Sequence, residues 1–140
     1  GWVGGGVGGV CLGVGVGGGV MGDRAGFVGA GYHRGIPGVN EQTALMAMVD
    51  SSIGGKTGVN AAAGKNLVGA LHHPVAVIAD LDTLETLPPR EFRQGFAEII
   101  KHAVIADAEM LDELQSFDRT QLAALVRRNI EIKARIVATD

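Results

Sequence analysis

The stretch LGVGVGGGVMGDRAGFVGAGY, residues 12–32, decides the expected fold, because an apolar segment leads through a glycine turn into a helix. Residues 11–16 alternate apolar side chains with glycine and predict a short strand, which glycine weakens. The turn covers residues 17–23, and Asp23 is a suitable N-cap for a helix that runs from there to Tyr32. Strand, glycine turn and helix in this order predict the start of an α/β domain.

The glycine turn satisfies G-x-G-x-x-G at residues 17–22, a pattern in which backbone N–H groups and a helix N-terminus face a pyrophosphate. Chance is the alternative interpretation, because 17 of the 23 glycines lie within residues 1–38 and the pattern also fits residues 13–18. The place of the turn between an apolar segment and a helix favours the functional interpretation.

Composition and charge exclude several classes of function. With 140 residues, a net charge of −3 and 4% aromatic residues, the chain has neither the basic stripe nor the aromatic platform of a nucleic-acid binder. Cys11 is the single cysteine, which excludes an internal disulfide and a cysteine-based zinc site and fits a cytoplasmic protein. Residues 1–22 are uncharged but dominated by glycine, so we expect neither a membrane-spanning helix nor a signal peptide.

The sequence divides into three parts. Residues 1–16 form a low-complexity glycine and valine segment, most of which we expect to be unstructured. Residues 17–87 carry the α/β pattern. Residues 88–140 contain one glycine and are rich in Ala, Leu, Glu and Arg, which predicts the start of an all-α domain.

The α/β part gives mixed signals for secondary structure. Residues 74–80 are the clearest strand, residues 44–49 form a short apolar helix, and residues 82–87 form one helical turn. Polar residues at 39–43 argue against a well-buried strand there. Glycine-rich loops are expected at 54–60 and 64–66.

Three helices are expected in the last part. Pro89 suits the first turn of the first helix, residues 107–115 form the second, and Asp118 caps a third that runs to the end of the chain. The third helix carries five residues at helical spacing on one face: Leu122, Leu125, Val126, Asn129 and Ile132.

Two lysines lie on the expected glycine-rich loops. SIGGKT, residues 52–57, resembles the tail of a P-loop, but Asp50 occupies the position of the first glycine, and its carboxylate would repel phosphate. Lys56 and Lys65 instead suit a ligand that carries phosphate, carboxylate or both. Two ordinary solvated lysines are the alternative.

Glu98 and Lys101 lie three residues apart on an expected helix. They form either a surface ion pair or, in a functional interpretation, a site in which Glu98 is an oxygen ligand of a metal. None of the four histidines stands at a spacing that completes a zinc set with Glu98. We therefore expect surface or hydrogen-bonded core roles for the histidines: His33, His72, His73 and His102.

Longer motifs resemble those of one enzyme family. VDSSIGGKTGVN (49–60), followed by GKN (64–66), resembles the signature of the 3-dehydroquinate synthases, and GGGVMGDRAGF (17–27) resembles their glycine turn. Further family motifs are matched in the same order by YHRG (32–35), DLDTLETLPPRE (80–91), GFAEIIK (95–101) and EIKARIVATD (131–140). The resemblance covers residues 12–140, and several long motifs in the right order make it specific.

The resemblance implies a Rossmann-like α/β part followed by a helical domain, with the site between them. It also implies NAD, zinc or cobalt, and a homodimer. The implied reaction belongs to the shikimate pathway of aromatic amino acid biosynthesis and converts the seven-carbon keto-acid phosphate DAHP into 3-dehydroquinate and phosphate. NAD takes a hydride, phosphate leaves, the hydride returns and an aldol step closes the ring.

The resemblance also implies roles for individual residues. Those that would meet NAD are Gly18, Gly19, Val20, Asp23, Thr43, Asp50, Lys56, Lys65, Thr83, Leu84 and Thr86. Those that would hold the substrate are Asp50, Lys56, Lys65, Asn66, Lys101 and Lys133, with Arg34 reaching the phosphate in the neighbouring subunit. Glu98 would be a zinc ligand.

The chain departs from the family pattern in places. Gln42 replaces a proline and Ala44 replaces a threonine beside Thr43, on the adenine side of the expected NAD site. The two histidine zinc ligands of the family would follow Asp140, so the chain resembles a central fragment. A related cyclase that acts on another seven-carbon phosphate and a non-catalytic NAD-binding remnant are the alternatives.

Overall fold

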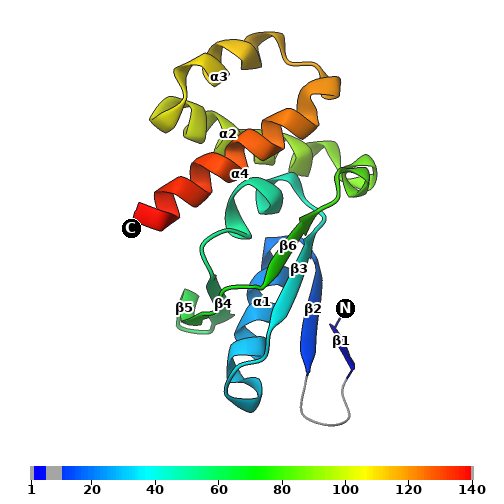
Figure 1. The fold of residues 1–140 in the computed structure, drawn as a ribbon, viewed down its shortest axis with the longest axis vertical. Helices are drawn as coiled ribbons and strands as arrows, with labels where there is room; N and C mark the ends of the chain where they lie inside the picture. The colour runs from blue at the N-terminus through cyan, green and yellow to red at the C-terminus, as the bar shows by residue number, and fades with distance from the viewer. Residues whose placement is uncertain (1, 6–10, 140) are drawn as a thin grey trace.

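The computed structural model describes residues 2–5 and 11–139. One sheet contains strands β1 (Trp2–Gly5), β2 (Leu12–Gly17), β3 (Gly38–Gln42) and β6 (Ala76–Ala79), in that order. The last three strands are parallel and β1 is antiparallel to β2. In Figure 1 helix α1 lies beside the sheet, and helices α2, α3 and α4 gather at one end of the molecule. The expected order of an α/β part followed by helices is confirmed.

The N-terminal segment is more regular than expected. The strand expected at residues 11–16 is confirmed as β2, but β1 also forms within the segment expected to be unstructured. Strand β1 forms because its backbone pairs with β2, in register from Trp2–Gly15 to Gly5–Leu12. The glycine-rich sequence does not predict this pairing. Residue 1 and residues 6–10 lie outside the described residues.

Helix α1 (Gly19–Gly31) begins earlier than the sequence indicates. The expectation that Asp23 is the N-cap is wrong: Gly18 is the N-cap, and Asp23 lies in the second turn. Gly17 has a φ of +149°, a conformation that favours glycine, and this lets the chain turn directly from β2 into the helix. The helix also lies close to Thr57, since a Cβ on Gly26 would lie 2.3 Å from Cγ2 of Thr57.

Strand β3 confirms that residues 39–43 do not form a well-buried strand, since only Gln42 of its five residues is buried, but a strand forms there nonetheless. It is polar, yet it pairs with β2 on one side and β6 on the other, and Gln42 is buried. Backbone hydrogen bonds on both edges make a strand here regardless of side-chain polarity. The amides of Asn40 and Gln42 then face Gly22 of α1, where a side chain on the helix would crowd them.

The two glycine-rich loops expected near Lys56 and Lys65 are instead the strands β4 (Lys56–Ala61) and β5 (Gly64–Leu71) of one antiparallel hairpin. The hydroxyl of Thr57 donates to the carbonyl of Ala70 at 2.8 Å and ties the two strands together. The strand expected at 74–80 is confirmed as β6, and the helical turn expected at 82–87 is η3 (Leu81–Thr86).

The helical part follows the sequence closely. Pro89 begins α2 (Pro89–Ala106), α3 spans Ala108–Glu113 and continues into the short turn η4 (Leu114–Ser116), and α4 spans Leu122–Thr139. Asp118 makes a capping box with Gln121 at the turn η5 (Arg119–Gln121) that leads into α4. The five residues expected on one face of α4 are all buried.

One apolar cluster joins the helices to the segment after β3. Leu45, Met48 and Val49 pack with Leu84 and with the inner faces of α2, α3 and α4. Gly95 allows this contact, because a Cβ there would lie 2.6 Å from Cγ of Leu45. The segment that carries Asp50 is therefore held against the helices. The domain boundary at residues 87–88 stays a prediction.

Candidate functional site

Asp50 is placed by a rare local structure. Residues 44–49 are helical as expected, but the helix widens into the π-helical turn η2 (Ala47–Ser51), in which the N–H of Ser52 donates to the carbonyl of Ala47. Met48 and Val49 are fully buried and anchor the turn. Turns of this kind are frequent at functional sites because they redirect one side chain out of the helical pattern. In this chain the η2 turn leaves the Asp50 carboxylate partly exposed beside the helices.

Lys133 on α4 reaches Asp50. Its Nζ donates to Oδ1 of Asp50 at 2.6 Å, and both side chains are about three-quarters buried. Ile132 and Asn129 are buried on the face of α4 that packs on the core, which fixes the position of Lys133 at the edge of that face. Two residues that the resemblance assigns to the substrate are thus brought together from positions 83 residues apart.

A cleft of about 490 Å³ lies at this ion pair, between α1, the hairpin and α4. Five of the residues expected at the site line it: Asp23, Asp50, Lys56, Asn66 and Lys133. Asp23 faces it from α1, and burial raises the pKa of its carboxyl. Asn66 has a φ of +57°, and its N–H donates to the side chain of Asn60, which fixes the tip of the hairpin beside the cleft.

Glu98 and Lys101 form the ion pair that is one of the two interpretations of their spacing. The Lys101 ammonium contacts Oε2 of Glu98, and this hydrogen bond is the main reason why the pKa of Lys101 is raised, with the negative charge of Asp50 adding to it. Lys101 is half exposed, so the pair itself adds little to stability.

The hydrogen-bonded core role expected for His102 is confirmed, but the structure also brings this histidine close to Glu98, which was not expected. His102 lies one helical turn after Glu98 on α2, and ligand atoms of Asp50, Glu98 and His102 all lie within 4.8 Å of one another. His102 is 1% exposed, and its Nδ1 lies 2.9 Å from Oδ1 of the buried Asn129. The i, i+4 spacing of Glu98 and His102 could have indicated this pair, but only tertiary packing brings Asp50 next to them.

The glycine turn leads into the first turn of α1, where the first backbone N–H groups of a helix have no partner within it. Gly19 lies against η2, because a Cβ there would come within 2.8 Å of Oγ of Ser51. The side chain of Val20 is exposed. Thr43 follows β3 directly, and its N–H donates to the carbonyl of Gly17, so it borders the same turn.

The remaining residues expected at the cofactor lie on η3. The hydroxyls of Thr83 and Thr86 donate to the carbonyls of Asp80 and Thr83. The side chain of Leu84 is buried in the core, so a contact of Leu84 with a cofactor would have to come from its backbone.

Lys101 does not line the cleft, and neither do two further residues expected at the substrate. Lys65 is exposed at the start of β5. Arg34 is exposed in the turn η1 (Tyr32–Arg34) at the far end of α1, with a φ of +68°. Their roles at the substrate and in a neighbouring subunit stay predictions.

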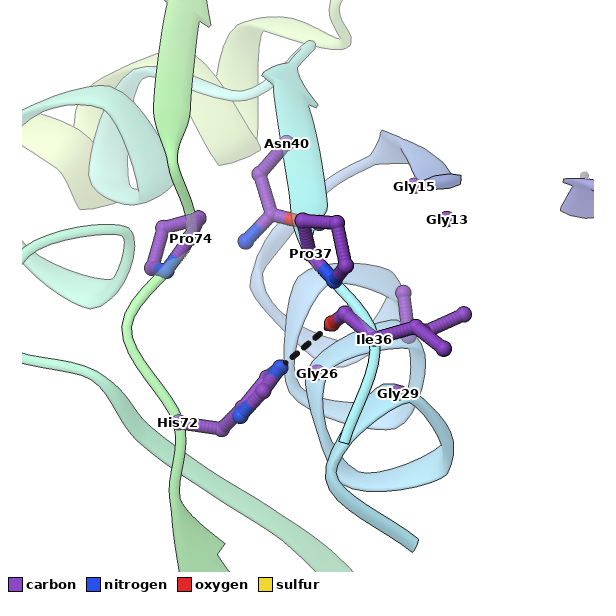
Figure 2. A pocket seen from close by; sticks show the side chains of 11 residues that line it. Gly13, Gly15, Gly26, Gly29, Ile36, Pro37, Asn40, His72 and Pro74 are labelled. Carbon is purple, nitrogen blue, oxygen red and sulfur yellow. Dashed lines mark hydrogen bonds between the residues drawn. The ribbon is translucent and has the colours of Figure 1, made fainter. Parts of the chain in front are cut away.

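A small hollow between α1 and the sheet contains His72 (Figure 2). Nε2 of His72 lies 2.8 Å from the carbonyl oxygen of Ile36, to which it donates as an N–H. This bond ties the end of β5 to the start of β3, and it confirms the structural role expected for His72.

No helix among the described residues is long and apolar enough to cross a membrane.

Comparisons with known proteins agree over residues 10–140. A family model described as 3-dehydroquinate synthase N-terminal matches residues 10–94, and one described as 3-dehydroquinate synthase C-terminal matches residues 95–140. A 3-dehydroquinate synthase of Cereibacter sphaeroides is 50% identical over 127 residues, and one of Symbiobacterium thermophilum is 52% identical over 128 residues. Each alignment covers 86% of this chain, which spans about a third of the length of these relatives, 34% and 36%.

Solved structures of related cyclases have the same fold. A 2-epi-5-epi-valiolone synthase from Streptomyces hygroscopicus with bound NAD+ and Zn2+ matches 85% of this chain and 36% of its own, with a TM-score of 0.79 and 34% identity. A 2-deoxy-scyllo-inosose synthase complexed with carbaglucose-6-phosphate, NAD+ and Co2+ matches 89% of this chain and 36% of its own, with a TM-score of 0.78 and 29% identity. Together with the two family models, these likenesses show that the chain belongs to the 3-dehydroquinate synthase family.

Proposed function

We propose that the chain forms the cofactor turn and part of the substrate site of a 3-dehydroquinate synthase, which converts DAHP into 3-dehydroquinate and phosphate. The observation that carries the proposal is the cleft, where Asp50, Lys56, Asn66 and Lys133 meet from separate segments of the chain. Two ammonium groups and an amide suit a ligand that bears both phosphate and carboxylate groups.

The carboxylate of Glu98 beside the cleft fits a divalent cation, because zinc and cobalt accept oxygen ligands. Glu98 is the residue that we assign to the metal, which its carboxylate would hold. When bound, the metal would polarise substrate hydroxyls and NAD would accept and return a hydride.

The cofactor turn fits a dinucleotide in a similar way. Gly17 permits the turn, and Gly18, Gly19 and Val20 present the backbone of the helix start without a bulky side chain at the first two positions. Asp23 would face the cofactor from the second turn of α1. The solved relatives that bind NAD+ support this assignment.

The chain's own residues would then bind and orient the substrate. Asp50 holds the Lys133 ammonium in a fixed place, and that ammonium keeps N–H donors for a substrate oxygen. Lys56 and Asn66 would bind from the hairpin side of the cleft and Lys101 from α2. We also propose that Arg34 reaches the substrate phosphate of a second copy in a homodimer, because its place far from this cleft leaves it no role in its own site.

A related cyclase acting on another seven-carbon phosphate is the second candidate, because solved structures that share the fold are named 2-epi-5-epi-valiolone synthase and 2-deoxy-scyllo-inosose synthase rather than 3-dehydroquinate synthase. The dehydroquinate assignment has the stronger support: identity is 50% and 52% to the named 3-dehydroquinate synthases but 34% and 29% to the solved cyclases.

A chimeric enzyme tests the proposal. Residues 12–139 would replace the matching segment of the Cereibacter sphaeroides relative, and phosphate release would be measured with NAD and zinc. We expect turnover of DAHP. A folded chimera that releases phosphate only from a seven-carbon sugar phosphate without the carboxylate would favour the second candidate. A folded chimera that binds NAD and acts on neither would favour a non-catalytic remnant.

A further inference from the structure

His102 is the one group of the Asp50–Glu98–His102 cluster that the resemblance leaves without a role. It is almost fully buried on α2 and lies between α4 and η2. A buried imidazole needs partners for both of its ring nitrogens, and the two nitrogens of His102 face different surroundings.

The first nitrogen is fixed by Asn129. Nδ2 of Asn129 donates to the carbonyl of Leu125 at 2.8 Å and lies 3.5 Å from the sulfur of Met110. A carbonyl can only accept, so the amide oxygen Oδ1 must be the atom that faces Nδ1 of His102 at 2.9 Å. Nδ1 therefore carries the proton and donates. In the neutral ring this leaves Nε2 unprotonated, with its lone pair free to accept.

The second nitrogen faces the site. Nε2 lies 3.8 Å from Oδ1 of Asp50, which is beyond hydrogen-bond distance, and both atoms are acceptors. Nε2 makes no hydrogen bond within the part of the chain that the structure describes, so it can accept one from a donor that reaches the site.

A metal ion is a poor candidate for that donor. Oδ1 of Asp50 already accepts from the Lys133 ammonium at 2.6 Å, and a divalent ion bound to the same oxygen would be repelled by that positive charge. A hydroxyl group fits better, since its oxygen can accept from Lys133 while its hydrogen is donated to Nε2 of His102.

We propose that His102 is a further substrate-binding residue, which accepts a hydrogen bond at Nε2 from one hydroxyl of the polyhydroxylated substrate, and that Asn129 is its positioning residue. Lys133, held by Asp50, donates to the same hydroxyl oxygen. The hydroxyl assignment rests on the proposed function, whereas the protonation pattern of His102 does not.

The first test is independent of activity. In the 140-residue chain labelled with 15N at histidine, long-range 1H–15N spectra should show His102 with a protonated Nδ1 and a bare Nε2. Asn129→Leu, which keeps the volume but removes the acceptor, should abolish this single pattern. A protonated Nε2 in the parent chain, or an Nε2 signal that shifts on adding zinc as a metal ligand does, would overturn the proposal.

The second test uses the chimera and DAHP analogues that each lack one hydroxyl. The chimera with its native His102 should discriminate against one analogue by about tenfold in kcat/KM, and His102→Phe should lose that discrimination while His102→Gln, which keeps an acceptor, restores part of it. NAD affinity should not change. A parent chimera that does not bind DAHP overturns the proposed function and the hydroxyl assignment with it. An active parent whose discrimination survives in His102→Phe overturns the His102 assignment alone.

Discussion

Nζ of Lys133 lies 2.6 Å from Oδ1 of Asp50, and this ion pair joins α4 to the π-helical turn η2. The pair closes one side of the cleft, and each partner orients the other. The same contact contributes to the packing of the two parts of the chain, so its removal tests function and stability together.

Lys133→Met should therefore lower phosphate release by the chimera about a hundredfold or more, since a cation at the reacting group is lost. The unfolding free energy should fall by about 1–3 kcal/mol, because the mostly buried Asp50 carboxylate loses its partner. Urea unfolding and steady-state rates measure the two effects. The control is Arg127→Met, which breaks an exposed ion pair with Glu131 on the same helix and should change neither. Retained turnover in Lys133→Met would contradict the assigned role.

Gly19→Val should abolish NAD binding. A Cβ at this position meets Oγ of Ser51 at 2.8 Å and would also block close approach of the helix start to a pyrophosphate. Gly31→Ala is the matched control on the same helix, since a Cβ there meets no atom within 4 Å. Calorimetry with NAD on both variants decides, and an unchanged affinity in Gly19→Val would refute the cofactor turn.

Lys56→Ala should act on turnover and leave the melting temperature of the chimera near that of the parent. Lys56 is exposed at the start of β4 and faces the cleft, so it contributes charge to the ligand site and little to packing. Arg90→Ala removes another exposed cation, on α2 outside the cleft, and should change neither turnover nor the melting temperature. A large melting shift with full activity in Lys56→Ala would show that the role of Lys56 is structural.

Acid should destabilise the helical part through Asp107. The hydrogen bond from the Arg128 guanidinium lowers the pKa of this carboxyl, which also caps α3 by accepting from the N–H of Met110. Because the pKa is lower in the folded state, the stabilisation is complete above the unfolded value of about 3.9 and is lost as the pH falls through the folded value.

Asp107→Ala should accordingly cost about 1 kcal/mol at neutral pH, the usual effect of losing a cap, and little in strong acid. Arg128→Met should flatten the pH dependence. Urea midpoints measured between neutral pH and about pH 3 test both. If parent and Arg128→Met have parallel pH profiles, the guanidinium does not set the acid sensitivity.

The 140-residue chain by itself should release no phosphate from DAHP. It spans about a third of the length of the relatives it matches, and the family resemblance assigns only Glu98 of its residues to zinc. A catalytic zinc needs about three protein ligands. A phosphate-release assay with NAD and zinc, run beside the chimera, measures this. Turnover within about tenfold of the chimera would mean that Asp50 and His102 complete the metal site from within the chain.

The sequence by itself determined the helical part. The capping box at Asp118, the Pro89 start of α2 and the buried face from Leu122 to Ile132 follow from contacts among residues no more than four apart along a helix. Local chemistry decides such features, so they can be predicted. The motifs of residues 49–66 and 95–101 likewise indicate the family through residue identity and spacing alone.

Strand β3, the hairpin and the candidate site depend on contacts between remote segments. Strand β3 is polar and the β4–β5 hairpin has the composition of loops, so neither shows the apolar alternation that indicates a strand. These strands form because their backbones pair with partner strands, which a local pattern does not reveal. Glu98 and His102 share α2, but the sequence placed Asp50 on a separate element with nothing to bring it to them. The meeting of the three residues depends on η2 and α2 packing on one core, where Met48 and Ile99 are both buried. Contacts between segments up to 83 residues apart are fixed by that packing, which no local pattern encodes.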